Sequence, residues 1–134
     1  MGKKKKVNTG MPKHLKEWRK KERRKYINMM AKNNELEVFF YVVKLYNDEE
    51  RFIKVGISVD IDKRFKNCPY NYKILRKGVF DLNRAWQIET MALNALYQKK
   101  VKYVPRIEFK GKTECFKTAA LLVVKKLLAQ NSIY

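Results

Sequence analysis

Four side chains between residues 41 and 89 carry functional groups suited to phosphodiester hydrolysis: a phenol, an ammonium, a guanidinium and a carboxylate, at Tyr41, Lys54, Arg64 and Glu89. The Arg64 guanidinium offers planar, paired donors to phosphate oxygens. The Glu89 carboxylate is a suitable ligand for a hard divalent ion such as Mg²⁺. A phenol such as that of Tyr41 can position a water or, once ionised, take its proton, but a free phenol titrates at about pH 10. We therefore expect Lys54 to lie close enough to lower the pKa of Tyr41.

Each of these side chains also has an ordinary structural explanation. Tyr41 alternates with apolar neighbours along a predicted strand, so it could simply be a buried core residue. Arg64 could be a solvated helix arginine, and Glu89 a surface glutamate paired with a lysine. Glu89 does, however, lie between the apolar Ile88 and Ala92 in a chain that is poor in acids.

The segment that must position the first three residues is a predicted hairpin followed by a helix. Runs rich in β-branched and aromatic residues, Phe39–Leu45 and Phe52–Val55, flank a polar turn at Tyr46–Arg51. Gly56 ends the second strand, and Ser58 is a candidate N-cap for the helix that carries Arg64.

The rest of the chain predicts one more strand and two longer helices. Tyr72–Phe80 is typical of a strand, and Asp81 can cap a helix over about residues 84–100, whose apolar residues recur at helical spacing. Residues 103–109 fit either a loop or a short strand. The last helix is predicted over about residues 115–129. The fold class is therefore α+β, with a small three-stranded, largely antiparallel sheet flanked by helices.

The net charge points to a polyanionic partner. The 134 residues contain 32 Lys and Arg against 13 Asp and Glu, a formal charge of +19, and so many unopposed positive charges repel one another unless a polyanion is near. Nucleic acid, with double-stranded DNA first, is the favoured partner, and an anionic membrane surface is second. The longest apolar run, Ala119–Val124, is too short to span a bilayer.

Residues 1–34 form a basic arm, and residues 35–134 form the domain. The arm carries 13 Lys and Arg against two Glu. A helix is predicted from Pro12, with Leu15, Trp18, Ile27 and Met30 as the apolar positions that could dock it. A nuclear-import signal is the alternative for its lysine run. The predicted nucleic-acid contacts of the arm are Lys3, Lys4, Lys5, Lys6, Lys16, Arg19, Lys20, Arg23 and Arg24.

The cysteines and the histidine do not suggest a zinc site or secretion. Cys68, Cys115 and His14 are isolated from one another and do not have zinc-ligand spacing. The basic first ten residues are not followed by the apolar stretch of a signal peptide. We expect a cytoplasmic protein, with a nuclear location left open by the lysine run.

Several short motifs, in order, resemble the GIY-YIG nuclease superfamily. Phe39–Tyr41 keeps the tyrosine of the first motif, and Lys54–Gly56 keeps the glycine of the second. Arg64 corresponds to the helix arginine and Glu89 to the metal-binding glutamate. Residues 111–116 read GKTECF, which is similar to the G-x-T-E-W-F segment that closes a phage and bacterial branch. The resemblance covers roughly residues 36–117 and rests on order and spacing together.

The resemblance implies a DNA endonuclease of the phage type, either a homing or a host-DNA-degrading enzyme, that depends on Mg²⁺ or Mn²⁺. Tyr41, Lys54, Arg64 and Glu89 would be catalytic, with Glu89 the metal ligand. This chain has lysine at position 54 where many members have tyrosine, and Asn94 where this branch often has histidine. A further set of candidates comprises Tyr70, Tyr72, Asn94 and Glu114.

Two other function classes are compatible with the same residues. The chain could be a catalytically inactive nucleic-acid-binding module of this fold, which the replaced tyrosine and histidine favour. It could also be a basic RNA-binding protein. A single small nuclease domain with a short arm would cut with limited specificity or act as a homodimer.

Overall fold

The chain folds into an antiparallel sheet flanked by helices, as the sequence predicts. The computed structural model describes residues 11–32, 37–109 and 114–131. The sheet order is β3-β1-β2-β4, and the fourth strand is a departure from the predicted three-stranded sheet. The elements in chain order are α1 (Lys13–Lys32), β1 (Glu37–Tyr46), β2 (Arg51–Ser58), α2 (Ile61–Phe65), β3 (Asn71–Asp81), α3 (Leu82–Gln98), β4 (Cys115–Phe116) and α4 (Ala120–Gln130).

The predicted hairpin is confirmed as β1 and β2. Its turn is closed by Asn47, whose side-chain Oδ1 accepts hydrogen bonds from the backbone N–H groups of Glu49 and Glu50, both at 2.8 Å. The strands pair in a register that sets Tyr41 opposite Gly56 and Val43 opposite Lys54. This register brings two of the predicted site residues onto neighbouring strands.

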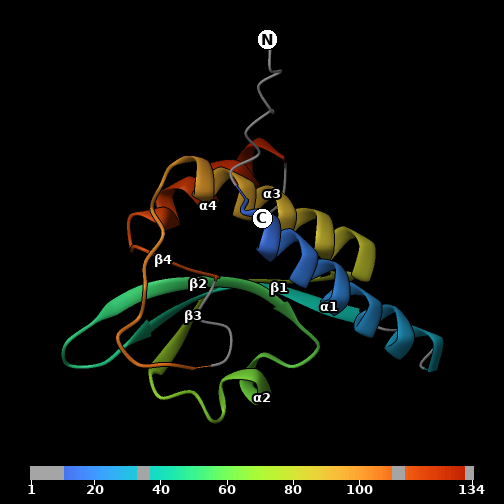
Figure 1. The fold of residues 1–134 in the computed structure, drawn as a ribbon, viewed down its shortest axis with the longest axis horizontal. Helices are drawn as coiled ribbons and strands as arrows, with labels where there is room; N and C mark the ends of the chain where they lie inside the picture. Colours follow the sequence, from blue (N-terminus) through green and yellow to red (C-terminus); the bar gives the residue numbers. More distant parts are fainter. Residues whose placement is uncertain (1–10, 33–36, 110–113, 132–134) are drawn as a thin grey trace.

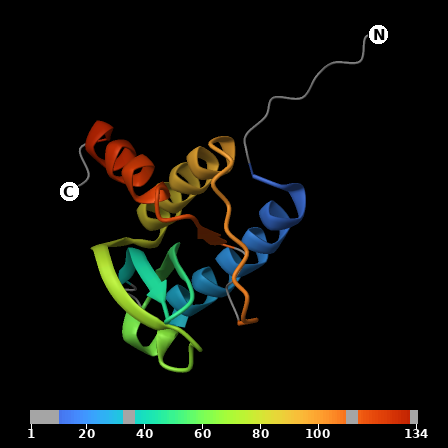
Figure 2. The same cartoon turned by 90° about the vertical axis from the view of Figure 1, so that its left-hand side faces the viewer.

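The sheet has two buried faces because its residues alternate in direction. Val38, Phe40 and Val42 of β1 pack against α3, α4 and part of α1, whereas Tyr41 and Val43 belong to a second core beneath α2. Figure 1 shows α1, α3 and α4 on one side of the sheet and α2 on the other, and in Figure 2 α3 lies between α4 and α1. Side chains from opposite faces of the sheet can therefore meet only around one of its edges.

The caps fix where the helices begin. Asp60, rather than the predicted Ser58, caps α2, since its Oδ1 accepts from the Lys63 N–H at 3.1 Å. The Ser58 hydroxyl instead bonds the backbone of Asp60. Asp81 caps α3 as predicted, since its Oδ1 accepts a hydrogen bond from the Arg84 N–H. The helix begins at Leu82, two residues before the predicted start.

The last helix begins later than predicted. Cys115 and Phe116 pair with Lys54 and Ile53 of β2 as a short strand, so α4 starts only at Ala120. The physical reason is that an unpaired edge of β2 offers these two apolar residues backbone hydrogen bonds and burial.

A buried carboxylate ties the hairpin turn to the segment that follows α3. Glu50 accepts hydrogen bonds from the hydroxyls of Tyr70 at 2.6 Å and Tyr103 at 2.5 Å and from the Arg106 N–H at 3.1 Å. Burial raises the pKa of Glu50, but the hydrogen bonds from Tyr103, Tyr70 and Arg106 outweigh it, and the pKa is lowered overall. Residues 103–109, left ambiguous by the sequence, form no strand.

The predicted arm helix is confirmed as α1, but its docking residues differ from those expected. Leu15 is buried with Met11 in the larger core. Trp18 and Ile27, expected to dock the helix, are 37% and 48% exposed. The inner face follows positions 11, 15 and 19, spaced four residues apart, and this spacing leaves Trp18 and Ile27 to one side. The side chain of Met30 and the boundary at residue 34 lie outside the described residues.

Candidate active site

Two of the four predicted side chains, Arg64 and Glu89, line a cavity beside β2, and the other two lie next to residues that line it. β4 pairs with β2 only at Ile53 and Lys54, so within the described residues no strand is paired to the outer edge of β2 beyond Lys54. A cavity of about 20 Å³ lies at this edge. It is lined by Gly56, Ile57, Arg64, Trp86, Glu89 and Glu114 and, from α1, by Trp18, Arg19 and Glu22.

Gly56 allows the tyrosine to approach this cavity. A Cβ added at Gly56 would lie 2.5 Å from the Tyr41 hydroxyl oxygen and 2.8 Å from its ring carbon Cζ, so the tyrosine lies directly over the glycine. Gly56, Arg64 and Glu89 all line the cavity, and Tyr41 lies behind the first of them. The structure thus brings Tyr41, with its neighbour Lys54, to the same edge as Arg64 and Glu89.

The Tyr41 hydroxyl is buried and has no hydrogen-bond partner among the described residues. Burial raises the pKa of Tyr41, and the opposing effects of Lys54 and Arg64 do not reverse this. Lys54 does lower the pKa of Tyr41, as expected, but by less than burial raises it, so the net shift is upward. The phenol is protonated at neutral pH, which suits it to bind and orient a water rather than to take its proton.

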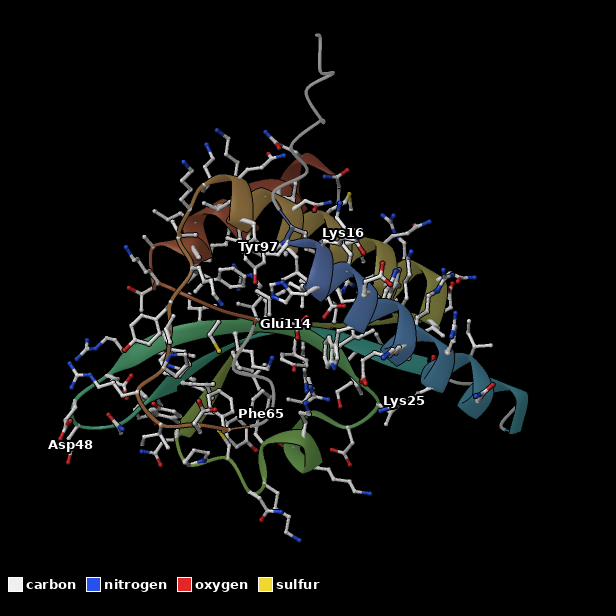
Figure 3. The ribbon with its side chains drawn as sticks, viewed as in Figure 1. Lys16, Lys25, Asp48, Phe65, Tyr97 and Glu114 are labelled. Carbon is white, nitrogen blue, oxygen red and sulfur yellow. The ribbon has the colours of Figure 1, made fainter. Side chains whose placement is uncertain are left out.

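Lys54 forms a buried ion pair with Glu114. The Lys54 Nζ lies 3.4 Å from the Glu114 Oε1, and both side chains are almost fully buried. Burial lowers the pKa of Lys54, but attraction to Tyr41 and Glu114 raises it by more, so the amine stays charged. Glu114 does not cap α4, which has no side-chain cap. Figure 3 labels Glu114 between the helical layer and the sheet.

Glu89 is held by an arginine that the sequence did not single out as its partner. The Arg19 Nη2 donates to the Glu89 Oε1 at 2.5 Å and Nη1 donates to the Thr90 hydroxyl at 2.9 Å. The Arg19 guanidinium also lies 4.0 Å from the centre of the Trp86 ring. Arg19 is only 4% exposed, so its prediction as a DNA contact is wrong for this structure. Its spacing of four residues from Leu15 is the signal that could have found it.

The remaining predicted nucleic-acid contacts have different positions. Lys16, Lys20 and Arg24 are exposed on α1, and Figure 3 labels Lys16 on that helix. Arg23 is partly buried and donates to Asn83 at 2.8 Å. The lysine run at residues 3–6 lies outside the described residues.

The other candidates are not part of the cavity. Tyr70 donates to Glu50, as described above. Tyr72 donates its hydroxyl to Asp62 at 2.6 Å and stacks on Phe65. Asn94 is not among the lining residues, and its partly buried side chain leaves Oδ1 without a hydrogen-bond partner. These three are better explained by packing within the fold.

The carboxylates at the cavity match the donor type that Mg²⁺ prefers. In the described ranges no group of three or more His, Cys, Asp and Glu is placed to hold a metal ion. Glu89 and Glu114 nevertheless line one cavity and offer hard oxygen donors. Mg²⁺ normally completes its shell with waters and substrate phosphates, so two carboxylates fit such an ion.

Stability should depend on the protonation of Glu89. Burial and repulsion by Glu114 raise the pKa of Glu89 to about 7, against the attraction of Arg19 and Lys54. A carboxyl group with a raised pKa in the folded chain stabilises the fold below its unfolded pKa, and this contribution is lost as the pH rises towards 7. We expect a loss on the order of 3 kcal/mol in the free energy of unfolding from this group.

Urea unfolding of the wild type and of Glu89→Gln at pH 5 and pH 8 measures this effect. Because glutamine resembles the protonated acid, the variant should gain stability relative to the wild type as the pH rises. A difference that stays constant across this range would show that Glu89 does not titrate there.

Comparison of the chain with protein-family models, with curated proteins and with solved structures finds no match. None of the helices within residues 11–32, 37–109 and 114–131 has the length and apolar character needed to cross a membrane. The function must therefore be argued from the site itself.

Proposed function

We propose that this protein is a metal-dependent DNA endonuclease related to the GIY-YIG nucleases. One observation carries this function: three functional groups lie together beside β2. The Arg64 guanidinium and the Glu89 carboxylate line one cavity. The buried Tyr41 hydroxyl, which has no hydrogen-bond partner among the described residues, lies behind Gly56 of the same cavity. The order of the elements, a hairpin, a helix with Arg64, a strand and a helix with Glu89, agrees with that resemblance.

Each side chain has a role in the hydrolysis. Arg64 would bind a non-bridging phosphate oxygen, and the Tyr41 hydroxyl would accept a hydrogen bond from the attacking water. As the water oxygen bonds to phosphorus, the bond to the leaving oxygen breaks; the attacking water gives up one proton to solvent, and the leaving oxygen takes up one proton from solvent. Lys54 would add positive potential near the developing negative charge. Mg²⁺, with Glu89 and Glu114 as its protein ligands, supplies Lewis-acid stabilisation when bound.

The excess of positive charge supports DNA as the substrate. Exposed lysines and arginines on α1, among them Lys16, Lys20 and Arg24, can contact phosphates without reading sequence. Each such contact steepens the salt dependence of binding, so affinity for duplex DNA should fall sharply as salt rises.

A nicking assay on supercoiled plasmid tests the proposal. At low salt we expect conversion to the open-circular form in Mg²⁺ or Mn²⁺ and none in EDTA, because the transition state then lacks its Lewis acid. Nicking that persists in EDTA would exclude the metal-dependent mechanism.

The second candidate function is an inactive nucleic-acid-binding module. The ion pair between Arg19 and Glu89 favours it, because that carboxylate is already satisfied within the protein. Salt-sensitive DNA binding without nicking in either metal would select this function over the first.

A further inference from the structure

Helix α1 covers the candidate active site. Trp18, Arg19 and Glu22 supply three of the side chains that line the cavity, and all three come from this one helix. Arg19 reaches furthest, since it bonds Glu89 and Thr90 and lies against Trp86. The carboxylate proposed to bind a metal is thus engaged by the protein's own guanidinium.

The cavity is too small for a substrate while α1 is in place. Its volume of about 20 Å³ is roughly what a single water needs. A phosphate group has four oxygens and requires several times that space. Arg64 also lines a wider pocket beneath α2, but a scissile phosphate or a hydrated ion can reach Glu89 through this cavity only after α1 has moved.

Apart from the contacts of Arg19 and the hydrogen bond from Arg23 to Asn83, few described contacts hold α1 to the rest of the chain. Met11, which precedes α1, and Leu15, which lies within it, are the described residues of this region that belong to the larger core. No described strand pairs with it, and the sheet and its packing against α3 and α4 are formed by later residues. The outer side of α1 is strongly basic, with exposed Lys13, Lys16, Lys20, Lys21, Arg24 and Lys25.

We propose that α1 is an inhibitory helix, displaced when its exposed basic side binds duplex DNA. Displacement withdraws Arg19 from Glu89 and opens the cavity to a phosphate and a metal ion. This inference rests on the proposed endonuclease function for its purpose, but the contact itself can be tested without turnover.

Metal binding tests the contact directly. The proteins compared are the wild type, Arg19→Ala and the control Lys125→Ala, which removes one positive charge from the exposed surface of α4. Binding of Mn²⁺ alone is measured from the loss of the electron paramagnetic resonance signal of the free ion. Arg19→Ala should bind Mn²⁺ at least about tenfold more tightly than the other two, a factor that corresponds to about 1.4 kcal/mol. The double variant Arg19→Ala/Glu89→Gln should lose this gain.

Tryptophan fluorescence tests displacement in the wild type and does not depend on whether a variant folds. The chain has two tryptophans, Trp18 and Trp86, and both line the cavity. Titration with a short duplex oligonucleotide in EDTA should shift their emission to longer wavelength as Trp86 loses Arg19 and becomes hydrated. Saturated DNA binding with unchanged emission would overturn the proposal.

Nicking rates separate the inhibitory role from its rivals. Arg19→Ala should nick plasmid several-fold faster than the wild type, because Glu89 is then free of the guanidinium before DNA arrives and α1 is held less tightly. Slower nicking by Arg19→Ala, or Mn²⁺ binding no tighter than that of Lys125→Ala, would mean that Arg19 does not inhibit. Tighter Mn²⁺ binding with no nicking by any variant would support the inhibitory contact and overturn the endonuclease function instead.

Discussion

Replacing Glu89 with glutamine is expected to lower Mg²⁺-dependent nicking by about 10²–10³-fold, the usual cost of losing one group that stabilises charge in a transition state. Glutamine keeps the shape of the side chain and one acceptor oxygen but loses the negative charge that attracts a divalent ion. Initial rates on supercoiled plasmid, with circular dichroism to verify folding, give the measurement.

Glu49→Gln is the matched control for this experiment. Its side chain is 76% exposed in the hairpin turn, and its carboxylate forms a surface pair with Arg106, at 3.4 Å. The control should nick at the wild-type rate. Nicking by Glu89→Gln within about threefold of that rate would remove Glu89 from the site, since even a modest catalytic contact is worth more.

Replacing Lys54 with methionine is expected to destabilise the fold by about 3–5 kcal/mol, the cost of breaking a buried ion pair by removing one partner. The Glu114 carboxylate would stay buried beside Glu89 without the ammonium that now lies 3.4 Å away. Methionine fills most of the space of the lysine stem, so the loss reports charge rather than a cavity. The midpoint of urea unfolding at pH 7 measures the change.

The double variant Lys54→Met/Glu114→Gln separates the ion pair from other effects of the substitution. Removing both charges should recover most of the lost stability, because replacing a whole buried pair is far less costly than breaking it. If the double variant were no more stable than the single one, the pair would not explain the burial of Lys54.

Local sequence patterns were enough to predict the elements that position the site. Alternating β-branched and aromatic residues identified the hairpin, and the turn residue Asn47 closes it. Helical spacing of apolar residues identified α3, and Asp81 marked its start. These features depend on neighbours in sequence, which is why a single chain reveals them.

The features that could not be predicted depend on contacts between distant segments. β4 has two residues, too few for a periodic pattern, and forms because the edge of β2 is available. The spacing of Arg19 from Leu15 predicts the face of α1 on which it lies, but only the packing of α1 on α3 shows that it contacts Glu89. The pKa of Tyr41 likewise depends on burial, which outweighs the lysine that the sequence suggested.

The hydrogen bonds of Glu50 extend the functional region to the far tip of the hairpin. Figure 3 shows this tip, marked by Asp48, well away from Glu114. Through Tyr103 and Arg106, Glu50 anchors the stretch that leads from α3 back towards Glu114. Because β4 is so short, that anchorage helps to set where the carboxylate sits. Substitutions in the turn, made for solubility or to attach a fusion partner, should therefore change the position of Glu114, although no turn residue lines the cavity.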